Sequence, residues 1–82
     1  MASLLMIADD FTGALDTGVQ FAASGVQTRV IVGGDVDLAA RGEDVQVLVI
    51  DAETRHLPPE RAYAVVEKLV RQAKALGVQY IY

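Results

Sequence analysis

Acidic side chains stand directly behind two apolar runs of the sequence. Asp9 and Asp10 follow "LLMIA", and Asp51 ends "VQVLVID". Neighbouring carboxylates repel one another and lose hydration on burial, so they usually persist where a cation, a hydroxyl-rich ligand or backbone N–H groups compensate. The pattern predicts a polar ligand site. The alternative is that Asp10 caps the following helix while Asp9 points into solvent.

A cation and a hydroxyl follow the second acidic run. The stretch "IDAETRHLPP" places Thr54 and Arg55 on a loop just behind Asp51. Arginine is suited to bidentate binding of a carboxylate, and its charge would relieve the repulsion among the aspartates. The alternative is an exposed ion pair between Arg55 and Glu53 or Glu60, which would contribute little.

The start of the first expected helix offers backbone donors. Thr12 is the expected N-cap, Gly13 would let a ligand approach the free N–H groups, and Asp16 follows one turn later. Asp16 could reach the same pocket or could simply be solvated. The sequence contains neither G-x-G-x-x-G nor G-x-x-x-x-G-K-[ST], so it indicates neither a dinucleotide fingerprint nor a P-loop.

Short β-branched runs and amphipathic stretches alternate along the chain. The runs predict strands over Ser3 to Ala8, Gln27 to Val32, Val45 to Asp51 and Val78 to Tyr82. With the intervening helices the order is β-α-β-α-β-α-β, which predicts an α/β fold. We expect a Rossmann-like parallel sheet in a three-layer α/β/α arrangement, as the truncated start of a larger domain. Ligand sites in such sheets lie at the carboxyl ends of the strands, where the aspartates stand.

Apolar spacing positions the helices. A brief helix is expected over Val36 to Ala40, and a long one begins at Pro58 and Pro59, ends before Gly77 and carries a Glu67–Arg71 pair. The apolar stripe of the long helix is Ala62, Val65, Val66, Leu69, Val70, Ala73 and Leu76. For the first helix, which Gly25 should end, the predicted stripe is Leu15, Gly18, Val19 and Ala22.

Bulk composition narrows the classes of function. The chain has 82 residues, no cysteine, 7 basic against 11 acidic residues and a net charge of -4. The scattered basic residues exclude the electrostatic footprint of a nucleic-acid binder, and the absence of cysteine excludes disulfides and thiolate metal sites. No apolar stretch reaches membrane-spanning length, so we expect a cytoplasmic protein without membrane partners.

Two stretches of the sequence resemble the start of the four-carbon acid sugar kinase family: "IADDFTGALDTGVQFAASGVQTRVIV" and "VLVIDAETRHLPPERAY". The first is the more specific, because its acidic pair, T-G-A, further Asp and T-G-V-Q-F at fixed spacing are hard to obtain from fold requirements alone. The resemblance covers nearly the whole chain and only the beginning of the family's proteins. It implies that residues 1–82 are the N-terminal part of the sugar-acid substrate-binding domain, without the C-terminal nucleotide-binding domain.

The resemblance also implies an activity. It indicates an ATP-dependent kinase for threonate, erythronate or 3-oxo-tetronate, with ATP and Mg²⁺ bound mainly by the missing domain, so that the 82-residue chain alone is expected to be inactive. Asp9 and Asp10 would face the substrate hydroxyls, and one of them would orient or deprotonate the attacking hydroxyl. Thr54 and Arg55 would contact the acid end of the sugar.

Two other classes of protein fit parts of the pattern. A receiver-like phosphoacceptor signalling domain would bind Mg²⁺ through Asp9, Asp10 and Asp51, and a non-catalytic sugar-acid-binding module would need only the ligand site. The continuing sequence would distinguish them. The apolar fourth strand, if it formed an exposed edge, would favour a homo-oligomer.

Overall fold

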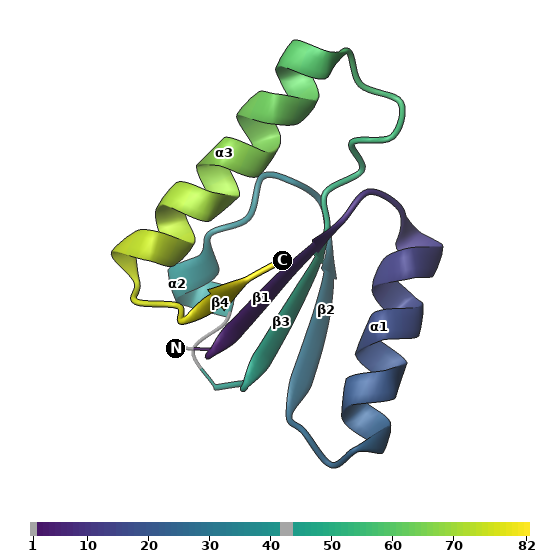
Figure 1. Ribbon diagram of the computed structural model, residues 1–82, viewed down its shortest axis with the longest axis vertical. Helices are drawn as coiled ribbons and strands as arrows, with labels where there is room; N and C mark the ends of the chain where they lie inside the picture. The colour runs from purple at the N-terminus through teal and green to yellow at the C-terminus, as the bar shows by residue number, and fades with distance from the viewer. Residues whose placement is uncertain (1, 42–43) are drawn as a thin grey trace.

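Four parallel strands form the centre of the molecule, and the computed structural model describes residues 2–41 and 44–82 (Figure 1). The elements in chain order are β1 (Leu4–Ala8), α1 (Phe11–Ala23), β2 (Thr28–Val32), α2 (Leu38–Arg41), β3 (Val47–Asp51), α3 (Pro59–Ala75) and β4 (Tyr80–Ile81). This order confirms the predicted alternation of strands and helices. Each strand begins one or two residues later than predicted, because regular ladder pairing starts inside the apolar runs: β4, for example, begins at Tyr80, which pairs with Leu4 of β1.

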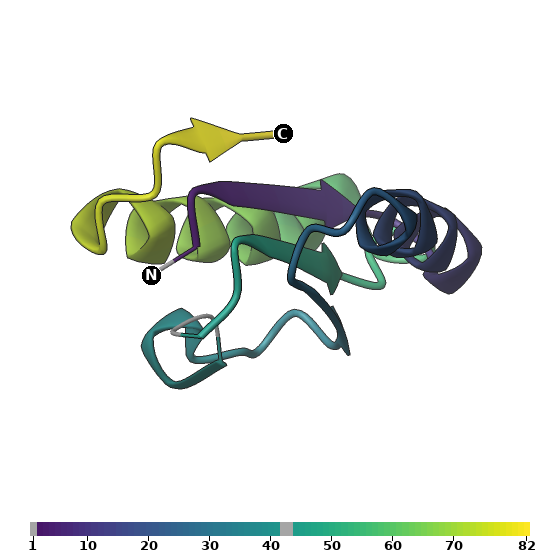
Figure 2. The same cartoon turned by 90° about the horizontal axis from the view of Figure 1, so that it is seen from below.

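The strands lie in the order β2-β3-β1-β4, so β4 and β2 form opposite edges of the sheet (Figure 2). At the carboxyl edge Asp51 is in register with Ala8 of β1 and Val32 of β2. Two apolar clusters show the layers: Ala14 of α1 packs with Val47 and Val49, whereas the opposite faces of the same strands pack with residues of α2 and α3. The predicted parallel three-layer α/β/α fold is confirmed.

Of the predicted apolar stripe of helix α1, Gly18 is buried, whereas Leu15, Val19 and Ala22 are exposed. Its buried residues are Ala14 and Gly18, whereas Leu15 and Val19 are 43 % and 58 % exposed. The reason is the close approach of α1 to the sheet, since a Cβ atom at position 18 would overlap Cγ2 of Val30. Small residues therefore face the sheet at positions 14 and 18, while Leu15 and Val19 are exposed and Phe21 packs against the edge of the cluster.

The predicted first cap is also wrong. Asp10, not Thr12, is the N-cap of α1, because its side chain accepts a hydrogen bond from the Gly13 N–H. At the other end Gly25 has the expected left-handed conformation, with φ of 82°, which a residue with a side chain rarely adopts.

Helix α3 follows its sequence pattern. Leu69 and Ala73 of the predicted stripe are fully buried, and Glu67 and Arg71 form the expected ion pair at 2.6 Å. The helix ends before Gly77, whose φ is 78°. The buried side of this helix could be predicted because its large and small apolar residues lie on one wide face.

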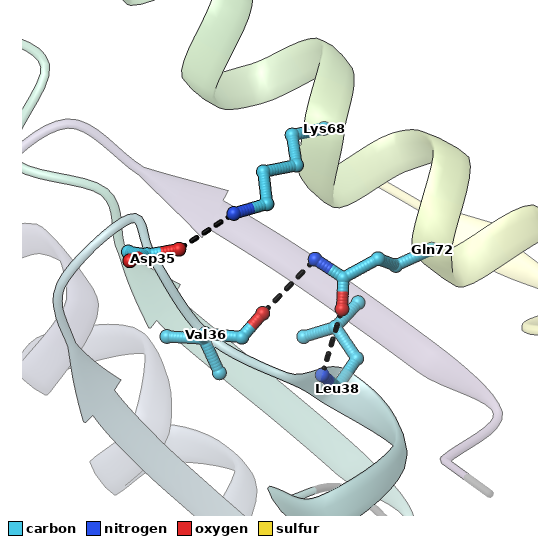
Figure 3. Close-up of polar contacts among 5 residues, drawn as sticks. All are labelled: Asp35, Val36, Leu38, Lys68 and Gln72. Atoms are coloured by element: carbon cyan, nitrogen blue, oxygen red, sulfur yellow. Dashed lines mark hydrogen bonds and ion pairs between the residues drawn. The ribbon is translucent and has the colours of Figure 1, made fainter.

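Side chains of α3 hold the connection before α2 (Figure 3). Gln72 Nε2 donates to the Val36 carbonyl at 2.9 Å, and the Leu38 N–H donates to Gln72 Oε1 at 3.0 Å. Lys68 pairs with Asp35 at 2.5 Å. The brief helix therefore starts at Leu38, two residues later than predicted, because the backbone before it bonds to Gln72.

None of the helices in the described part of the chain combines the length and the apolar character needed to cross a bilayer.

Candidate functional site

The strand order creates a crevice between β1 and β3. These strands are neighbours, but β1 leads into α1 on one face of the sheet and β3 leads into α3 on the other. Loops that leave adjacent strands in opposite directions separate at the carboxyl edge, which is where open α/β sheets bind ligands. The loop with Asp9 and Asp10 therefore faces the loop with Thr54 and Arg55.

Asp10 joins the two sides of this crevice. Its Oδ1 accepts a hydrogen bond from the Gly13 N–H at 2.7 Å, and its Oδ2 lies 2.9 Å from Arg55 Nη2. The side chain of Asp10 is 28 % exposed and that of Arg55 is 58 % exposed. Asp10 thus caps α1, which the sequence left as the alternative to a ligand site. It also pairs with Arg55, the cation that the ligand-site interpretation expected near the aspartates.

Arg55 pairs with Asp10 and with neither Glu53 nor Glu60 within the described residues. Two local turns hold its loop: the Glu53 N–H donates to Asp51 Oδ1 at 3.1 Å, and the Leu57 N–H donates to the Thr54 carbonyl at 3.1 Å. The loop geometry, rather than sequence proximity, therefore selects the partner of Arg55.

Asp9 and Thr54 line one pocket of about 330 Å³. Asp9 is exposed and Thr54 is half-buried. The rest of the pocket wall is apolar or aromatic and comes from β1, α3 and the end of the chain: Ile7, Ala8, Val66, Val70, Ile81 and Tyr82. A hydroxyl and a carboxylate over an apolar wall suit a small polyhydroxy compound better than a highly charged one.

The remaining predicted residues lie along the start of α1. Gly13 is in the site, because it donates to Asp10 and because a Cβ atom there would come within 3.1 Å of Asp10 Oδ1. Thr12 and Asp16 are exposed, and neither makes a side-chain hydrogen bond to another described residue. The structure therefore joins Asp10 with Gly13 and Arg55 and places Asp9 with Thr54 in one pocket. It leaves Thr12 and Asp16 exposed beside them.

Sequence reasoning missed the conformation of Glu53. Its φ is 56°, a left-handed value that is uncommon for a residue with a side chain. Nothing in the types of residue around it predicts this conformation. The nearest signal is Asp51, since an aspartate often accepts a hydrogen bond from the N–H two residues later.

The geometry does not favour a receiver-like signalling domain. Within residues 2–41 and 44–82, no three histidine or acidic side chains come together in a way that could hold a metal ion. In addition, β1 lies between β3 and β4, whereas the flavodoxin-like order has the second strand beside the first.

The chain is similar to a sugar-binding domain family and to three proteins named as threonate or erythronate kinases. The family model described as "Sugar-binding N-terminal domain" matches residues 4–82. A D-threonate kinase of Salmonella typhimurium is 41 % identical over 63 residues, which cover 77 % of this chain and 14 % of that protein. A D-threonate kinase of Bordetella bronchiseptica is 40 % identical over 81 residues, covering 94 % of this chain and 20 % of its own length.

A D-erythronate kinase of Heliobacterium modesticaldum is 35 % identical over 71 residues, covering 87 % of this chain and 16 % of that protein. The chain therefore spans between 14 % and 20 % of the length of these curated relatives. No solved structure matches at a comparable level of significance.

Proposed function

The chain belongs to the sugar-binding N-terminal domain family, within the four-carbon acid sugar kinases, and we propose that it forms part of the substrate-binding domain of an ATP-dependent kinase. The proposed substrate is a four-carbon sugar acid such as threonate or erythronate. The names of the three relatives support this class of substrate. A nucleotide-binding domain outside these residues would bind ATP and Mg²⁺.

The Asp10–Arg55 contact across the crevice is the observation that carries the proposal. Both groups are partly exposed, so their ion pair contributes about 0–1 kcal/mol and a competing carboxylate can displace Asp10 at small cost. The acid group of the substrate would bind Arg55 bidentately. Asp10 would stay in place, because its Oδ1 remains bonded to the Gly13 N–H, and its released Oδ2 would accept a substrate hydroxyl.

The same contacts divide the work between the two aspartates. One oxygen of Asp10 caps α1 and the other would bind the substrate, whereas Asp9 is exposed in the pocket that it lines with Thr54. We therefore assign Asp9 to the reacting hydroxyl. In the transfer step the hydroxyl oxygen forms a bond to the γ-phosphorus of ATP, ADP leaves, and the hydroxyl proton passes to Asp9.

The test is substrate-dependent formation of ADP by the full protein that carries this chain, after its intact mass has been measured. The substrates are the D and L forms of threonate and erythronate. Threitol and erythritol, which have the same carbon chain without the acid group, are matched controls. We expect turnover with at least one of the acids and none with the two alditols, because Arg55 binds the acid group.

Three variants sharpen the result. Arg55→Ala should raise KM for the acid about tenfold or more, since it removes a charge-assisted contact. Asp9→Asn should lower kcat at least as much as Asp10→Asn, because a general base contributes roughly 10²–10⁴-fold. Binding of the acids without ADP formation would leave a non-catalytic binding module, and the kinase proposal would be wrong. If the protein neither bound the acids nor formed ADP with them, the proposed substrate class would be wrong as well.

A further inference from the structure

Asp51 is a buried acidic side chain that the proposed function does not yet use. It is fully buried at the carboxyl end of β3, in register with Ala8, the residue before the acidic pair. A buried carboxylate is unfavourable unless its oxygens are compensated. One oxygen, Oδ1, accepts the Glu53 N–H at 3.1 Å, and the other, Oδ2, has no hydrogen-bond partner among the described residues.

The bond from Oδ1 is made to an unusual residue. Glu53 has φ of 56°, which costs energy for a residue with a Cβ atom unless the surroundings enforce it. The hydrogen bond from the Glu53 N–H to Asp51 Oδ1 stabilises this conformation, as in the turns that aspartate side chains form with the backbone two residues later. A second turn follows at once, closed by the Leu57 N–H that donates to the Thr54 carbonyl at 3.1 Å.

The backbone around Asp51 is itself fixed. Its carbonyl accepts the Gly33 N–H at 2.8 Å, and the next residue, Ala52, donates its N–H to the Ala8 carbonyl at 2.9 Å. The backbone at Asp51 is therefore hydrogen-bonded on both sides of β3, and the side chain of Asp51 holds the Glu53 backbone in a fixed position relative to the sheet. Since Oδ2 has no partner in the described residues, the hydrogen bond that Oδ1 accepts from the Glu53 N–H is the side-chain contact by which Asp51 holds the loop.

We propose that Asp51 is the positioning residue of the sugar-acid site: its Oδ1 fixes the turn at Glu53 that directs Arg55 across the crevice to Asp10. This inference rests on the proposed function for its effect on substrate binding. Asp51 does not touch the substrate. It acts through the loop, so that Arg55 is already in place before the acid group arrives.

Three variants of the full protein test this role. Asp51→Asn and Asp51→Ser keep an oxygen that can accept the Glu53 N–H, whereas Asp51→Ala removes it. We expect Asp51→Ala to raise KM for the acid by roughly five- to tenfold, the effect of one lost hydrogen bond, with KM for ATP unchanged. Asp51→Asn should have a KM for the acid within about twofold of the wild-type value. Val47→Ala, at the opposite end of the same strand, is the control for a general loss of stability.

A second readout does not depend on catalysis. Hydrogen exchange of the Glu53 amide should be slow in the wild type and in Asp51→Asn, and fast in Asp51→Ala. If the wild type bound no sugar acid, the proposed function would fail, and this exchange pattern would still decide the role of Asp51. If Asp51→Ala does not fold, Asp51→Asn alone decides: a loss of acid binding in this variant would mean that the charge of Asp51 matters and not the turn. Unchanged KM or unchanged exchange in a folded Asp51→Ala would likewise overturn the proposal.

Discussion

Replacing Asp10 by two different residues should separate the two contacts of its carboxylate. Oδ1 accepts from the Gly13 N–H at 2.7 Å, and Oδ2 pairs with Arg55 at 2.9 Å. Alanine removes both contacts, whereas asparagine keeps a capping oxygen and removes the charge. A lost N-cap destabilises by about 1 kcal/mol and a partly exposed ion pair contributes about 0.5 kcal/mol. We therefore expect Asp10→Ala to lower the free energy of unfolding by about 1.5 kcal/mol, and Asp10→Asn by only about 0.5 kcal/mol.

The assay is urea unfolding followed by circular dichroism, with the variants measured alone and combined with Arg55→Ala. The Asp10→Asn and Arg55→Ala pair should show a coupling energy of about 0.2–1 kcal/mol that decreases at high salt. Asp16→Ala, an exposed aspartate of the same helix, is the matched control and should change stability by less than about 0.5 kcal/mol. Equal losses for Asp10→Ala and Asp10→Asn would refute the assignment of Asp10 as the cap, and zero coupling would refute the contact with Arg55.

Three further variants test contacts that hold the helices and the connection before α2 in place. Gln72→Met removes both hydrogen bonds to the connection before α2, so it should destabilise by about 2 kcal/mol in urea unfolding, whereas Gln20→Met on the exposed face of α1 should be nearly neutral. Gly18→Ala should destabilise despite a gain of about 1 kcal/mol in helix propensity, because overlap with Val30 costs about 1–3 kcal/mol; a stabilised variant would contradict the close approach of α1. The hydrogen bond and charge of Lys68 hold the pKa of Asp35 below its usual 3.8, so the stability that this pair contributes is present above that pH and is lost as the pH falls through the lowered value. Lys68→Met should therefore lose less stability than the wild type between about pH 6 and about pH 3, with Lys74→Met as the control; equal losses in all three proteins would exclude the pair as a source of acid sensitivity.

The sequence was sufficient where one local rule decided the outcome. The carboxyl ends of parallel strands share an edge, so Asp10 and Arg55 could be expected on the same side of the sheet before their contact was known. The stripe of α3 could be predicted because Leu69 and Ala73 stand among other apolar residues on one wide face.

Prediction failed where the distance between elements decided the outcome. Leu15 and Val19 are larger and more apolar than Ala14, so periodicity placed them beside Gly18 on the predicted stripe, although they are exposed and Ala14 is buried. Position 18 has no room for a side chain because of Val30, which lies in another element. The left-handed conformation of Glu53 has the same kind of cause, since it depends on a bond to a buried side chain.

The cover over each strand, and the place of each aspartate in or after its strand, explain why three similar aspartates have different environments. β3 lies between β1 and β2 and is buried along its whole length, so Asp51 at its end is buried too. β1 is less covered, because α1 packs mainly on β2 and β3. Of the residues after β1, Asp9 is exposed and Asp10 is partly exposed. The same residue type at the same kind of strand end is thus suited to hold a turn in one case and to meet a ligand in the other. The packing of the helices on the sheet and the last paired residue of each strand, which local sequence does not specify, separate these two roles.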